Sequence, residues 1–309
     1  MKKVSILIPC YNEGHNITLI YNALRIVIDK RQDYQWEIMF VNDGSKDDTL
    51  ECIKRLNKED SCINYISLSR NFGKENALLA GFDNVGGDCT VIIDADLQHP
   101  PYLLEEMLQY WEKGFDDVYA QRANRGKESW LRRNFSMGYY KLLQKMAQID
   151  ILPNVGDFRL LDRKCINALR QLRETQRYNK GLYCWIGYKK KKIVFDQADR
   201  THGKSSFNYY KLFNLAIEGI TSYTTAPLRI STIAGIVISL VAFFYMCFIL
   251  IKTILYGDPV QGYPTLIVVI LFLGGIQLLS LGIIGEYLGR IFYETKARPA
   301  YIIDEMMVR

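Results

Sequence analysis

The sequence predicts an α/β protein: a mostly parallel sheet with helices on both faces, followed by helices that enter a membrane. Two observations lead to this fold class. Residues 3–120 alternate short apolar runs with stretches of helical apolar spacing, a pattern typical of parallel sheets. Residues 233–251 and 264–285 carry no charged side chain, and each run is long enough to cross a hydrocarbon core of about 30 Å. A chain of 309 residues has room for both parts.

The individual elements follow from the spacing of apolar residues along the chain. Short apolar runs predict buried strands, and apolar residues three and four apart predict helices. The expected strands cover residues 4–8, 37–41, 63–68, 90–93 and 117–120, and the expected helices cover residues 17–28, 49–56, 75–82 and 103–111. No Gly-x-Gly-x-x-Gly pattern follows the first strand, so we do not expect a dinucleotide site.

Polar side chains follow four of the expected strands, at the point where each strand ends. They lie in residues 9–13, 42–45, 70–74 and 94–98. Ligands of open α/β sheets bind at the carboxyl ends of the strands, so we expect these four clusters to form one site. The sequence Asn42-Asp43-Gly44-Ser45 is also typical of an ordinary turn and helix cap, which is the alternative for that cluster.

Asp94 and Asp96 are the most informative pair in these clusters. Side chains alternate along a strand, so the two carboxylates point the same way and repel each other unless a cation lies between them. Mg²⁺ and Mn²⁺ take oxygen ligands and often share them with substrate phosphates. The pair predicts a metal–diphosphate site, with an exposed strand-end turn as the alternative. Asp43 is suited to accept the N–H of a uracil-like base, and Arg70 or Lys74 to offset diphosphate charge.

These clusters resemble the motifs of the inverting glycosyltransferases of family 2, which have the GT-A fold. The matching residues are Pro9-Cys-Tyr-Asn-Glu13, Val41-Asn-Asp-Gly-Ser45, Arg70-Asn-Phe-Gly73 and Asp94-Ala-Asp-Leu-Gln98. The second half is similar to the polyprenyl-phosphate glycosyltransferases, which include dolichyl-phosphate mannose synthase and the bactoprenol glucosyltransferases. That similarity rests on Arg122, Arg125-Gly126, Arg132-Arg133, Ser136, Asp157-Phe158-Arg159 and the stretch from Arg200 to Ser205.

The resemblance implies an enzyme that moves a sugar from a nucleotide diphosphate to a polyprenyl phosphate, with inversion. It implies donor-binding roles for Pro9, Tyr11, Asn12, Glu13, Asp43, Arg70, Lys74, Asp94, Ala95, Asp96, Gln98 and Lys204. It implies lipid-phosphate binding by Arg122, Arg132, Arg133 and Ser136. The expected metal is Mg²⁺ or Mn²⁺ on Asp96 and Asp94, and the expected catalytic residues are Asp157, Arg200 and Asp96.

The nature of the nucleophile decides what Asp157 is expected to do. An aspartate at this position is often treated as the catalytic base in the family. A phosphate monoester, however, has a second pKa of about 6 and is mostly dianionic at neutral pH. We therefore expect Asp157 to position Arg159 or the sugar hydroxyls, and Arg200 with Lys204 to close over the diphosphate. Asp96 is expected to be indispensable and Asp94 less so.

The second half of the chain predicts attachment to a membrane. Residues 130–149 and 207–228 are basic and aromatic with helical apolar spacing, which favours interfacial helices; plain surface helices are the alternative. Arg132 and Arg133 also suit anionic lipid in general. The loop at 257–263 holds no Lys or Arg, whereas both flanks of the apolar pair do, so both flanks are expected in the cytoplasm. Two buried core helices are the alternative to two membrane spans.

The expected organisation has four parts. Residues 1–205 form the GT-A catalytic domain, residues 206–229 a juxtamembrane amphipathic helix, residues 230–289 two transmembrane helices with an external loop, and residues 290–309 a cytoplasmic tail. We expect a bacterial inner membrane with both termini cytoplasmic. Seven cysteines without a Cys-x-x-Cys pattern fit a reducing compartment.

Composition also limits the partners. A net charge of +6 is modest, so we expect no nucleic-acid partner. Five glycines of the second expected span and its end allow close contact with the first span or with another subunit, which leaves a homo-oligomer open: Gly274, Gly275, Gly282, Gly285 and Gly289.

Three other functions explain the sequence less well. A processive polysaccharide synthase would carry a Gln-x-x-Arg-Trp signature, which is absent from this sequence. A membrane scaffold or flippase component would leave the aspartate pair and the arginines unexplained. A soluble or protein acceptor would leave the two apolar runs unexplained. By resemblance the expected donor is UDP-glucose, and N-acetylglucosamine, mannose and aminoarabinose donors stay open.

Overall fold

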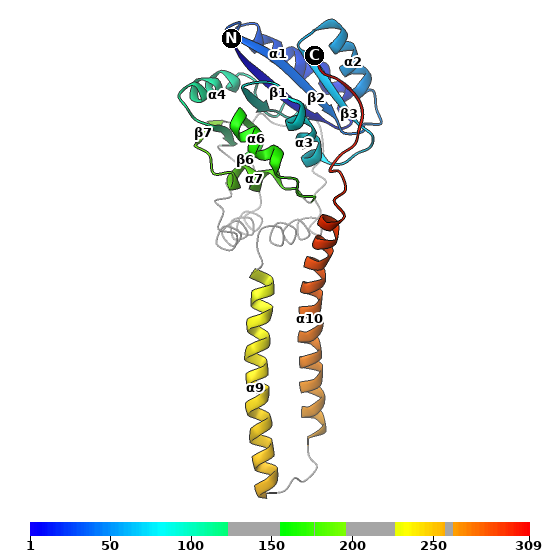
Figure 1. Ribbon diagram of the computed structural model, residues 1–309, viewed down its shortest axis with the longest axis vertical. Coiled ribbons are helices and arrows are strands. Elements are labelled where there is room, and N and C mark those ends of the chain that lie inside the picture. Colours follow the sequence, from blue (N-terminus) through cyan, green and yellow to red (C-terminus); the bar gives the residue numbers. More distant parts are fainter. Residues whose placement is uncertain (123–154, 176, 196–225, 257–261) are drawn as a thin grey trace. The chain divides into compact units, whose positions relative to one another are not determined.

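The computed structural model describes residues 1–122, 155–175, 177–195, 226–256 and 262–309. The chain forms two compact units (Figure 1). The first comprises residues 1–207 together with residues 298–309, and the second comprises residues 208–297. The last residues of the chain therefore belong to the same unit as the first.

In its described part, the first unit contains an eight-stranded mixed sheet in the order β7-β5-β6-β4-β1-β2-β3-β8. Its centre is parallel, as predicted: β4 (Cys89–Ile92), β1 (Lys2–Cys10), β2 (Tyr34–Asn42) and β3 (Ile63–Leu68) run in the same direction. The predicted fifth strand, β5 (Asp117–Arg122), is parallel to β7 (Lys190–Phe195). Two strands run antiparallel to their neighbours, β6 (Val155–Asp162) between β4 and β5 and β8 (Ile303–Met307) beside β3.

Helices cover both faces of this sheet, as the alternating pattern predicts. One face packs against α1 (Gly14–Ile28), α2 (Thr49–Glu59) and α4 (Leu103–Glu112). The other packs against α3 (Lys74–Asn84), α6 (Arg163–Gln171) and α7 (Asn179–Trp185). Successive residues of β1 alternate between the two cores: Ile6 and Ile8 lie in the first and Leu7 in the second.

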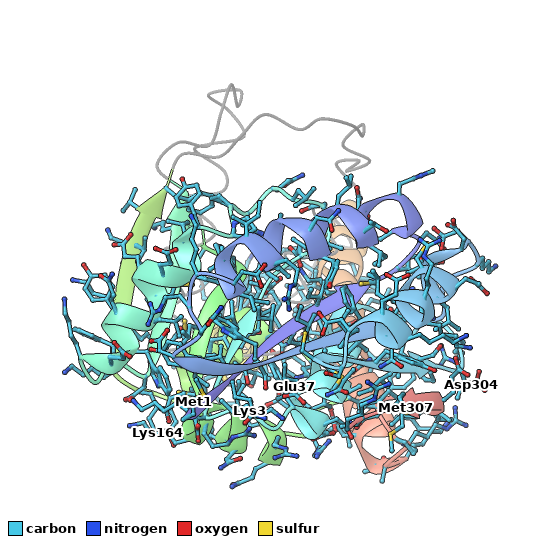
Figure 2. The ribbon with its side chains drawn as sticks, turned by 90° about the horizontal axis from the view of Figure 1, so that it is seen from above. Met1, Lys3, Glu37, Lys164, Asp304 and Met307 are labelled. Carbon is cyan, nitrogen blue, oxygen red and sulfur yellow. The ribbon has the colours of Figure 1, made fainter. Side chains whose placement is uncertain are left out.

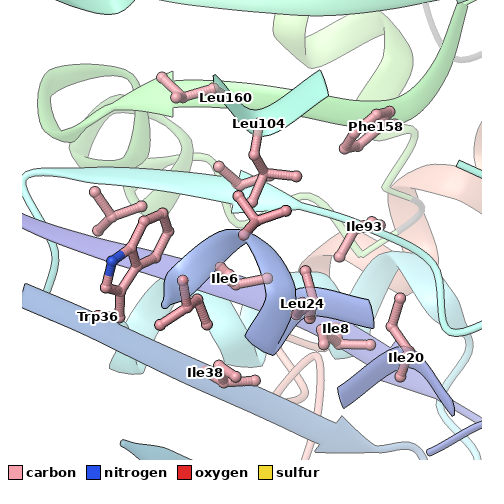
Figure 3. Packing of buried hydrophobic residues seen from close by; sticks show 14 of the residues in the cluster. Ile6, Ile8, Ile20, Leu24, Trp36, Ile38, Ile93, Leu104, Phe158 and Leu160 are labelled. Atoms are coloured by element: carbon pink, nitrogen blue, oxygen red, sulfur yellow. The ribbon is translucent and has the colours of Figure 1, made fainter. Parts of the chain in front are cut away.

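The packing of α1 shows how the apolar spacing produces this arrangement. Ile17, Ile20 and Leu24 recur three and four residues apart, and all three are fully buried. Ile20 and Leu24 pack over Ile6 and Ile8 of β1 (Figure 3). Full burial of such a side chain contributes about 1.5–3 kcal/mol, so these contacts fix the helix on the sheet and place its first residue at the carboxyl end of β1.

A buried acidic residue lies at the amino-terminal end of the strands, away from the polar clusters. Glu37 accepts hydrogen bonds from Ser5 Oγ, from Asn64 Nδ2 at 2.9 Å and from the N–H of Gly86 at 2.9 Å. Lys3 Nζ lies 3.3 Å from Glu37 Oε1, and Figure 2 shows the two residues close together. The charge of Glu37 is thus compensated within the fold, which is a structural role.

Three strands lie outside the strands expected from the sequence. β6 and β7 complete one edge of the sheet, and the lysine run from residue 189 leads into β7, where Lys192 and Val194 are exposed. Lysines on an edge strand discourage pairing with other chains. β8 lies within the segment expected to be a tail, and it adds to the opposite edge instead.

The β8 segment is attached to the first unit by side chains as well as by its ladder. Tyr301 Oη donates to Asp83 Oδ2 of α3 at 2.6 Å, and Lys54 Nζ of α2 lies 2.5 Å from Glu305 Oε1. The N–H of Ser69 donates to the carbonyl of Ile302 at 3.0 Å. The segment that follows the second unit is therefore in direct contact with the chain just beyond β3.

The second unit contains two long helices, α9 (Ala226–Tyr256) and α10 (Tyr263–Thr295). Among the described residues, one helical stretch is long and apolar enough to cross a membrane, Phe272–Thr295, with a mean hydropathy of 1.3 and none of it buried. The apolar stretch of α9, Ser231–Tyr245, is shorter, so the second predicted span stays a prediction. Ser231 Oγ lies 2.8 Å from Ser280 Oγ, a polar contact of the kind that joins helices in lipid.

Among the described atoms, none lies close to the five glycines of α10. A Cβ built at any of the five would meet no described atom within 4 Å. The described residues of the first apolar run therefore do not supply the expected contact with these glycines. Contact with another subunit stays a prediction.

Candidate active site

The loops after β1 and β2 are joined by side chains of the predicted clusters. The N–H of Asn12 donates to Ser45 Oγ at 2.9 Å, and Asn12 Oδ1 accepts from the N–H of Lys46 at 2.9 Å. Asn12 has a φ of 55°, in the left-handed region that asparagine tolerates better than most residues. These reciprocal bonds bring two of the four clusters together.

The loop after β3 is held by Asp43 from the end of β2. Asp43 is 2% exposed, and its two oxygens accept the N–H of Phe72 at 2.7 Å and of Gly73 at 2.9 Å. Burial raises the pKa of Asp43, and these backbone N–H groups oppose the rise. Both carboxylate oxygens of Asp43 accept hydrogen bonds from the loop after β3, so Asp43 positions that loop. Its expected contact with a base stays a prediction.

Gly44 permits the close approach of these two loops. It has a φ of +63°, and a Cβ at this position would lie 2.3 Å from the carbonyl carbon of Arg70. Arg70 itself lies with its guanidinium 4.0 Å from the ring centre of Phe72. The glycine of the Asn-Asp-Gly-Ser motif is therefore required by backbone contact, as well as by the turn.

The antiparallel pairing of β4 and β6 sets two carboxylates against each other. The ladder pairs Ile92 with Arg159, and continuing the same register two residues further places Asp94 opposite Asp157. Like charges directly opposite each other are destabilising. Lys74, the first residue of α3, lies at this point: its Nζ is 2.6 Å from Asp94 Oδ1 and 2.7 Å from Asp157 Oδ2.

The charges of this group act on one another. Burial opposes the charged form of Lys74, but Asp94 and Asp157 outweigh it and raise the lysine pKa well above its ordinary value. Burial likewise raises the pKa of Asp157, but the charge of Lys74 outweighs it and holds that pKa below its ordinary value. Lys74 and Asp157 are therefore both charged at neutral pH.

Arg159 has a different partner from the one expected. Its guanidinium is 2% exposed, lies 3.1 Å from Asp117 Oδ2 of β5 and stacks 3.8 Å from the ring centre of Tyr183. The charge of Arg159 also lowers the pKa of Asp157, but by less than Lys74 does, so the predicted positioning of Arg159 by Asp157 stays a prediction. Asp157 forms its own ion pair with Lys74.

Asp96 and Glu13 extend the acidic edge toward β1. Asp96 Oδ1 accepts the N–H of Gln98 at 3.1 Å, and Leu97 between them has a φ of 58°, a strained value for leucine. Burial raises the pKa of Glu13, its hydrogen bond from Asn16 opposes the rise, and the charges of Asp96 and Asp94 add to it. The first and fourth clusters therefore lie within electrostatic range of each other.

Two residues beside this group, the buried His99 and the partly buried Glu75, were not predicted. His99 is 3% exposed, lies between the rings of Phe158 and Phe195, and places Nδ1 4.0 Å from Asp94 Oδ2. Burial, with the charge of Asp157, raises the pKa of Glu75 to about 7. Both follow a predicted site residue directly in the sequence, but nothing in the local pattern indicates that they lie beside the acidic group.

The residues at this edge suit a divalent cation that is shared with a substrate. Asp94 and Asp96 supply carboxylate oxygens, which are the donors that Mg²⁺ and Mn²⁺ prefer. Within the described ranges no group of three or more His, Cys, Asp or Glu side chains is arranged to hold a metal ion. A cation here would take its remaining ligands from a bound phosphate or from water, as Mg²⁺ commonly does.

The other predicted residues divide into two groups. Pro9, Tyr11 and Ala95 lie at the same edge, with Tyr11 exposed and Ala95 buried. The backbone of Arg122 ends β5 opposite Phe195. The remaining predicted site residues lie outside the described part of the chain: Arg132, Arg133, Ser136, Arg200 and Lys204. The expected interfacial helix at residues 130–149 also lies outside it.

The carboxyl ends of the central parallel strands thus carry an acidic edge, a lysine and a loop held by Asp43, and comparisons with known proteins identify the family of the chain. The model of glycosyl transferase family 2 matches residues 5–170, and that of the GtrB C-terminal hairpin matches residues 226–291. The chain belongs to glycosyltransferase family 2, and it is an enzyme of the group that carries this hairpin.

Relatives match over nearly the whole chain. The glycosyltransferase CsbB of Bacillus subtilis (strain 168) is 49% identical over 98% of this chain and 91% of its own length. Bactoprenol glucosyl transferase of Shigella phage SfX is 42% identical over 97% of this chain and 98% of its own. The prophage bactoprenol glucosyl transferase homolog of Escherichia coli (strain K12) is 42% identical over 98% and 99%.

A solved structure with a similar fold is glucosyl-3-phosphoglycerate synthase from Mycobacterium tuberculosis in complex with Mn²⁺, UDP-glucose and phosphoglyceric acid. It is 17% identical, covers 71% of this chain and 78% of its own, and has a TM-score of 0.48.

Proposed function

We propose that this enzyme transfers glucose from UDP-glucose to a polyprenyl phosphate at the cytoplasmic face of a membrane, with inversion. The observation that carries the proposal is the match, over nearly the full chain, to proteins named as bactoprenol glucosyl transferases, with the C-terminal hairpin included. The edge formed by Asp94, Lys74 and Asp157 supplies the charges that such a donor requires.

The donor would lie across the carboxyl ends of β1 to β4. The loop held by Asp43 would receive the nucleoside, and Lys74 would meet the diphosphate. Asp96 and Asp94 would hold a divalent cation, which when bound stabilises the negative charge that develops on the departing nucleoside diphosphate. Outside the described residues, Arg200 and Lys204 would add positive charge on the same phosphates.

The phosphate of the acceptor is the nucleophile, and it is already ionised. A polyprenyl phosphate is mostly dianionic at neutral pH because its second pKa is about 6, so attack on the sugar requires little proton transfer. Asp157, held against Lys74, would orient the sugar hydroxyls, and the low pKa of this carboxyl makes it a weak proton acceptor. Arg122, Arg132, Arg133 and Ser136 would hold the lipid phosphate.

The return of the chain to the first unit supports a membrane hairpin. β8 pairs with β3 in the sheet that also contains β1, so residues 208–297 leave the first unit and come back to it. A folded unit lies on one side of a membrane, so any segment that leaves and returns must cross an even number of times. Two crossings, with both flanks cytoplasmic, agree with the placement of basic residues.

The test is transfer of radiolabelled sugar into an organic-extractable lipid by the full chain in membranes. UDP-glucose is compared with UDP-N-acetylglucosamine, GDP-mannose and an aminoarabinose donor, each with undecaprenyl phosphate and Mn²⁺ or Mg²⁺. Glucose should enter the lipid fraction, and Asp96→Ala should abolish its transfer. Transfer of another sugar in preference to glucose would reassign the donor, and no lipid product with any donor would reject the acceptor.

A further inference from the structure

The ion pairs at the acidic edge place one lysine between the predicted metal site and the predicted catalytic carboxylate. Lys74 Nζ contacts Asp94 and Asp157 at 2.6 and 2.7 Å. The side chain of Lys74 is 40% exposed, whereas those of Asp94 and Asp157 are 25% and 10% exposed. The carboxylates are therefore more enclosed than the lysine that neutralises them, and the lysine has access to anything bound outside the edge.

This contact affects one of the two carboxylates that would bind a cation. A carboxylate binds a metal ion best when it is deprotonated and is not already paired with another positive charge. One oxygen of Asp94 is taken by Lys74, and the other lies 4.0 Å from His99 Nδ1. A cation that entered without a donor would meet a positive ammonium beside Asp94. It would also find no group of three acidic or His side chains among the described residues.

A nucleoside diphosphate changes this balance. Its phosphate oxygens offer the ammonium of Lys74 an alternative anion, and they offer a cation the ligands that the described protein residues lack. Charges this close together interact strongly at a partly enclosed site, so the position of the Lys74 ammonium affects which anion a metal ion meets.

We propose that Lys74 couples the two ligands: it neutralises Asp94 in the donor-free enzyme, and it turns to the diphosphate when the donor binds, which frees Asp94 for the divalent cation. The cation then binds together with the nucleotide sugar and only weakly before it. The same movement frees Asp157 Oδ2, which becomes available to the sugar. This inference rests on the proposed function only for the identity of the donor as a nucleoside diphosphate.

The test measures Mn²⁺ binding to the full chain in detergent, without and with UDP. The electron paramagnetic resonance signal reports the concentration of free Mn²⁺. Wild type should bind Mn²⁺ at least about tenfold more tightly with UDP, within the usual range of coupling between ligands. Lys74→Gln should bind Mn²⁺ about tenfold more tightly than wild type when UDP is absent, and UDP should add less to its affinity.

Two variants separate coupling from a loss of charge or of structure. Lys164 forms a similar pair, 2.7 Å from Asp116, at the opposite edge of the sheet from β8 (Figure 2). Lys164→Gln removes one positive charge and should leave Mn²⁺ binding at the wild-type value. Lys74→Arg keeps the charge and should bind Mn²⁺ weakly without UDP, as wild type does. The melting temperature of each variant shows that it is folded.

Two results would overturn the inference. One is a folded Lys74→Gln protein whose Mn²⁺ affinity without UDP equals that of wild type and of Lys164→Gln. The other, which requires no variant, is a wild-type enzyme that binds Mn²⁺ equally well with and without UDP. Failure of the proposed function gives a different result, because absence of glucose transfer to lipid would leave the Mn²⁺ measurements unchanged.

Discussion

At the scale of single residues, the surroundings of Asp157 bear on its predicted role of positioning the sugar. It faces Lys74 at 2.7 Å, it is 10% exposed, and one of its oxygens, Oδ1, has no hydrogen-bond partner among the described residues. A buried oxygen without a partner suits a group that substrate will contact. Burial raises the pKa of Asp157, but Lys74 lowers it by more, so the carboxylate is better suited to orient a hydroxyl than to remove a proton.

Asp157→Asn is expected to reduce glycosyl transfer by about 10²-fold or more, the usual effect of losing one group that orients charge at the reacting centre. The loss should be similar at neutral and mildly alkaline pH, because the lipid phosphate is ionised in both. A pH–rate profile of wild type and variant measures this. A residual rate that climbs steeply with pH until it meets the wild-type rate would assign Asp157 as the base.

Glu75 predicts a pH dependence of stability. Its folded-state pKa is raised to about 7 by burial and by Asp157, while Asn179 N–H, Lys74 and Lys180 oppose the rise. In an unfolded chain the pKa of glutamate is about 4.3. The stability contributed by protonated Glu75 is therefore fully present below about pH 4.3 and is lost as pH rises through about 7.

Glu75→Gln removes this titration and keeps an oxygen that accepts the N–H of Asn179, which now lies 3.0 Å from Glu75 Oε2. The melting temperature of the variant relative to wild type should rise between pH 5 and pH 8, by an amount set by about 1.4 kcal/mol per pKa unit. Thermal unfolding at a series of pH values measures the difference. A constant difference across that range would show that Glu75 does not titrate there.

At the scale of elements, the site depends on loops that are fixed by backbone contacts. Asp43 receives two N–H groups from the loop after β3, and Gly44 lets that loop pass within contact distance of the turn after β2. The strands supply the position of each loop, and these contacts supply its conformation. A change in the turn after β2 should therefore affect the loop after β3.

Gly44→Ala tests this with a matched control, Gly114→Ala. Both glycines have positive φ, +63° and +83°, so both alanines are strained by about 1–2 kcal/mol. A Cβ at Gly44 also meets backbone at 2.3 Å, whereas one at Gly114 meets nothing within 4 Å. Gly44→Ala should be the less stable by chemical unfolding and should bind UDP more weakly. Equal stability and equal UDP affinity would show that the two loops are independent.

The sequence predicts the elements whose signals are local. The strands β1 to β5 and the helices between them have regular apolar spacing, and the four clusters follow from strand ends that share an edge. β7 begins with three lysines and β8 is short and half exposed, so neither carries a buried-strand pattern. Their pairing depends on neighbours far away in the sequence. The pairing of Asp94 with Asp157 through Lys74 has the same origin, because it depends on the antiparallel register of β6.

At the scale of the whole molecule, the stability of the first unit depends on its last residues. β8 supplies a ladder to β3, Tyr301 bonds to Asp83 and Lys54 pairs with Glu305. A chain that ends at Ala297 should lose all of these and unfold at a lower temperature. Tyr301→Phe, which loses one hydrogen bond, should cost only about 0.5–1.5 kcal/mol.

The truncated chain and Tyr301→Phe are compared with wild type by thermal unfolding of the first unit, monitored by tryptophan fluorescence. The truncated chain should also be cut faster by protease, because β3 would become an exposed sheet edge. A truncated chain with the wild-type melting temperature would show that β8 does not contribute to the stability of the sheet.

The position of β8 also constrains the order of events during synthesis. Most of the first unit is made before α9 leaves the ribosome, and domains generally fold as they emerge, at about 5–20 residues per second. Arg309, the last residue, donates its N–H to Asn64, which lies 245 positions earlier. The edge of β3 therefore stays open until the residues of β8 have been synthesised, after both helices of the second unit. Factors that insert the hairpin would thereby also control the last step in folding the catalytic unit.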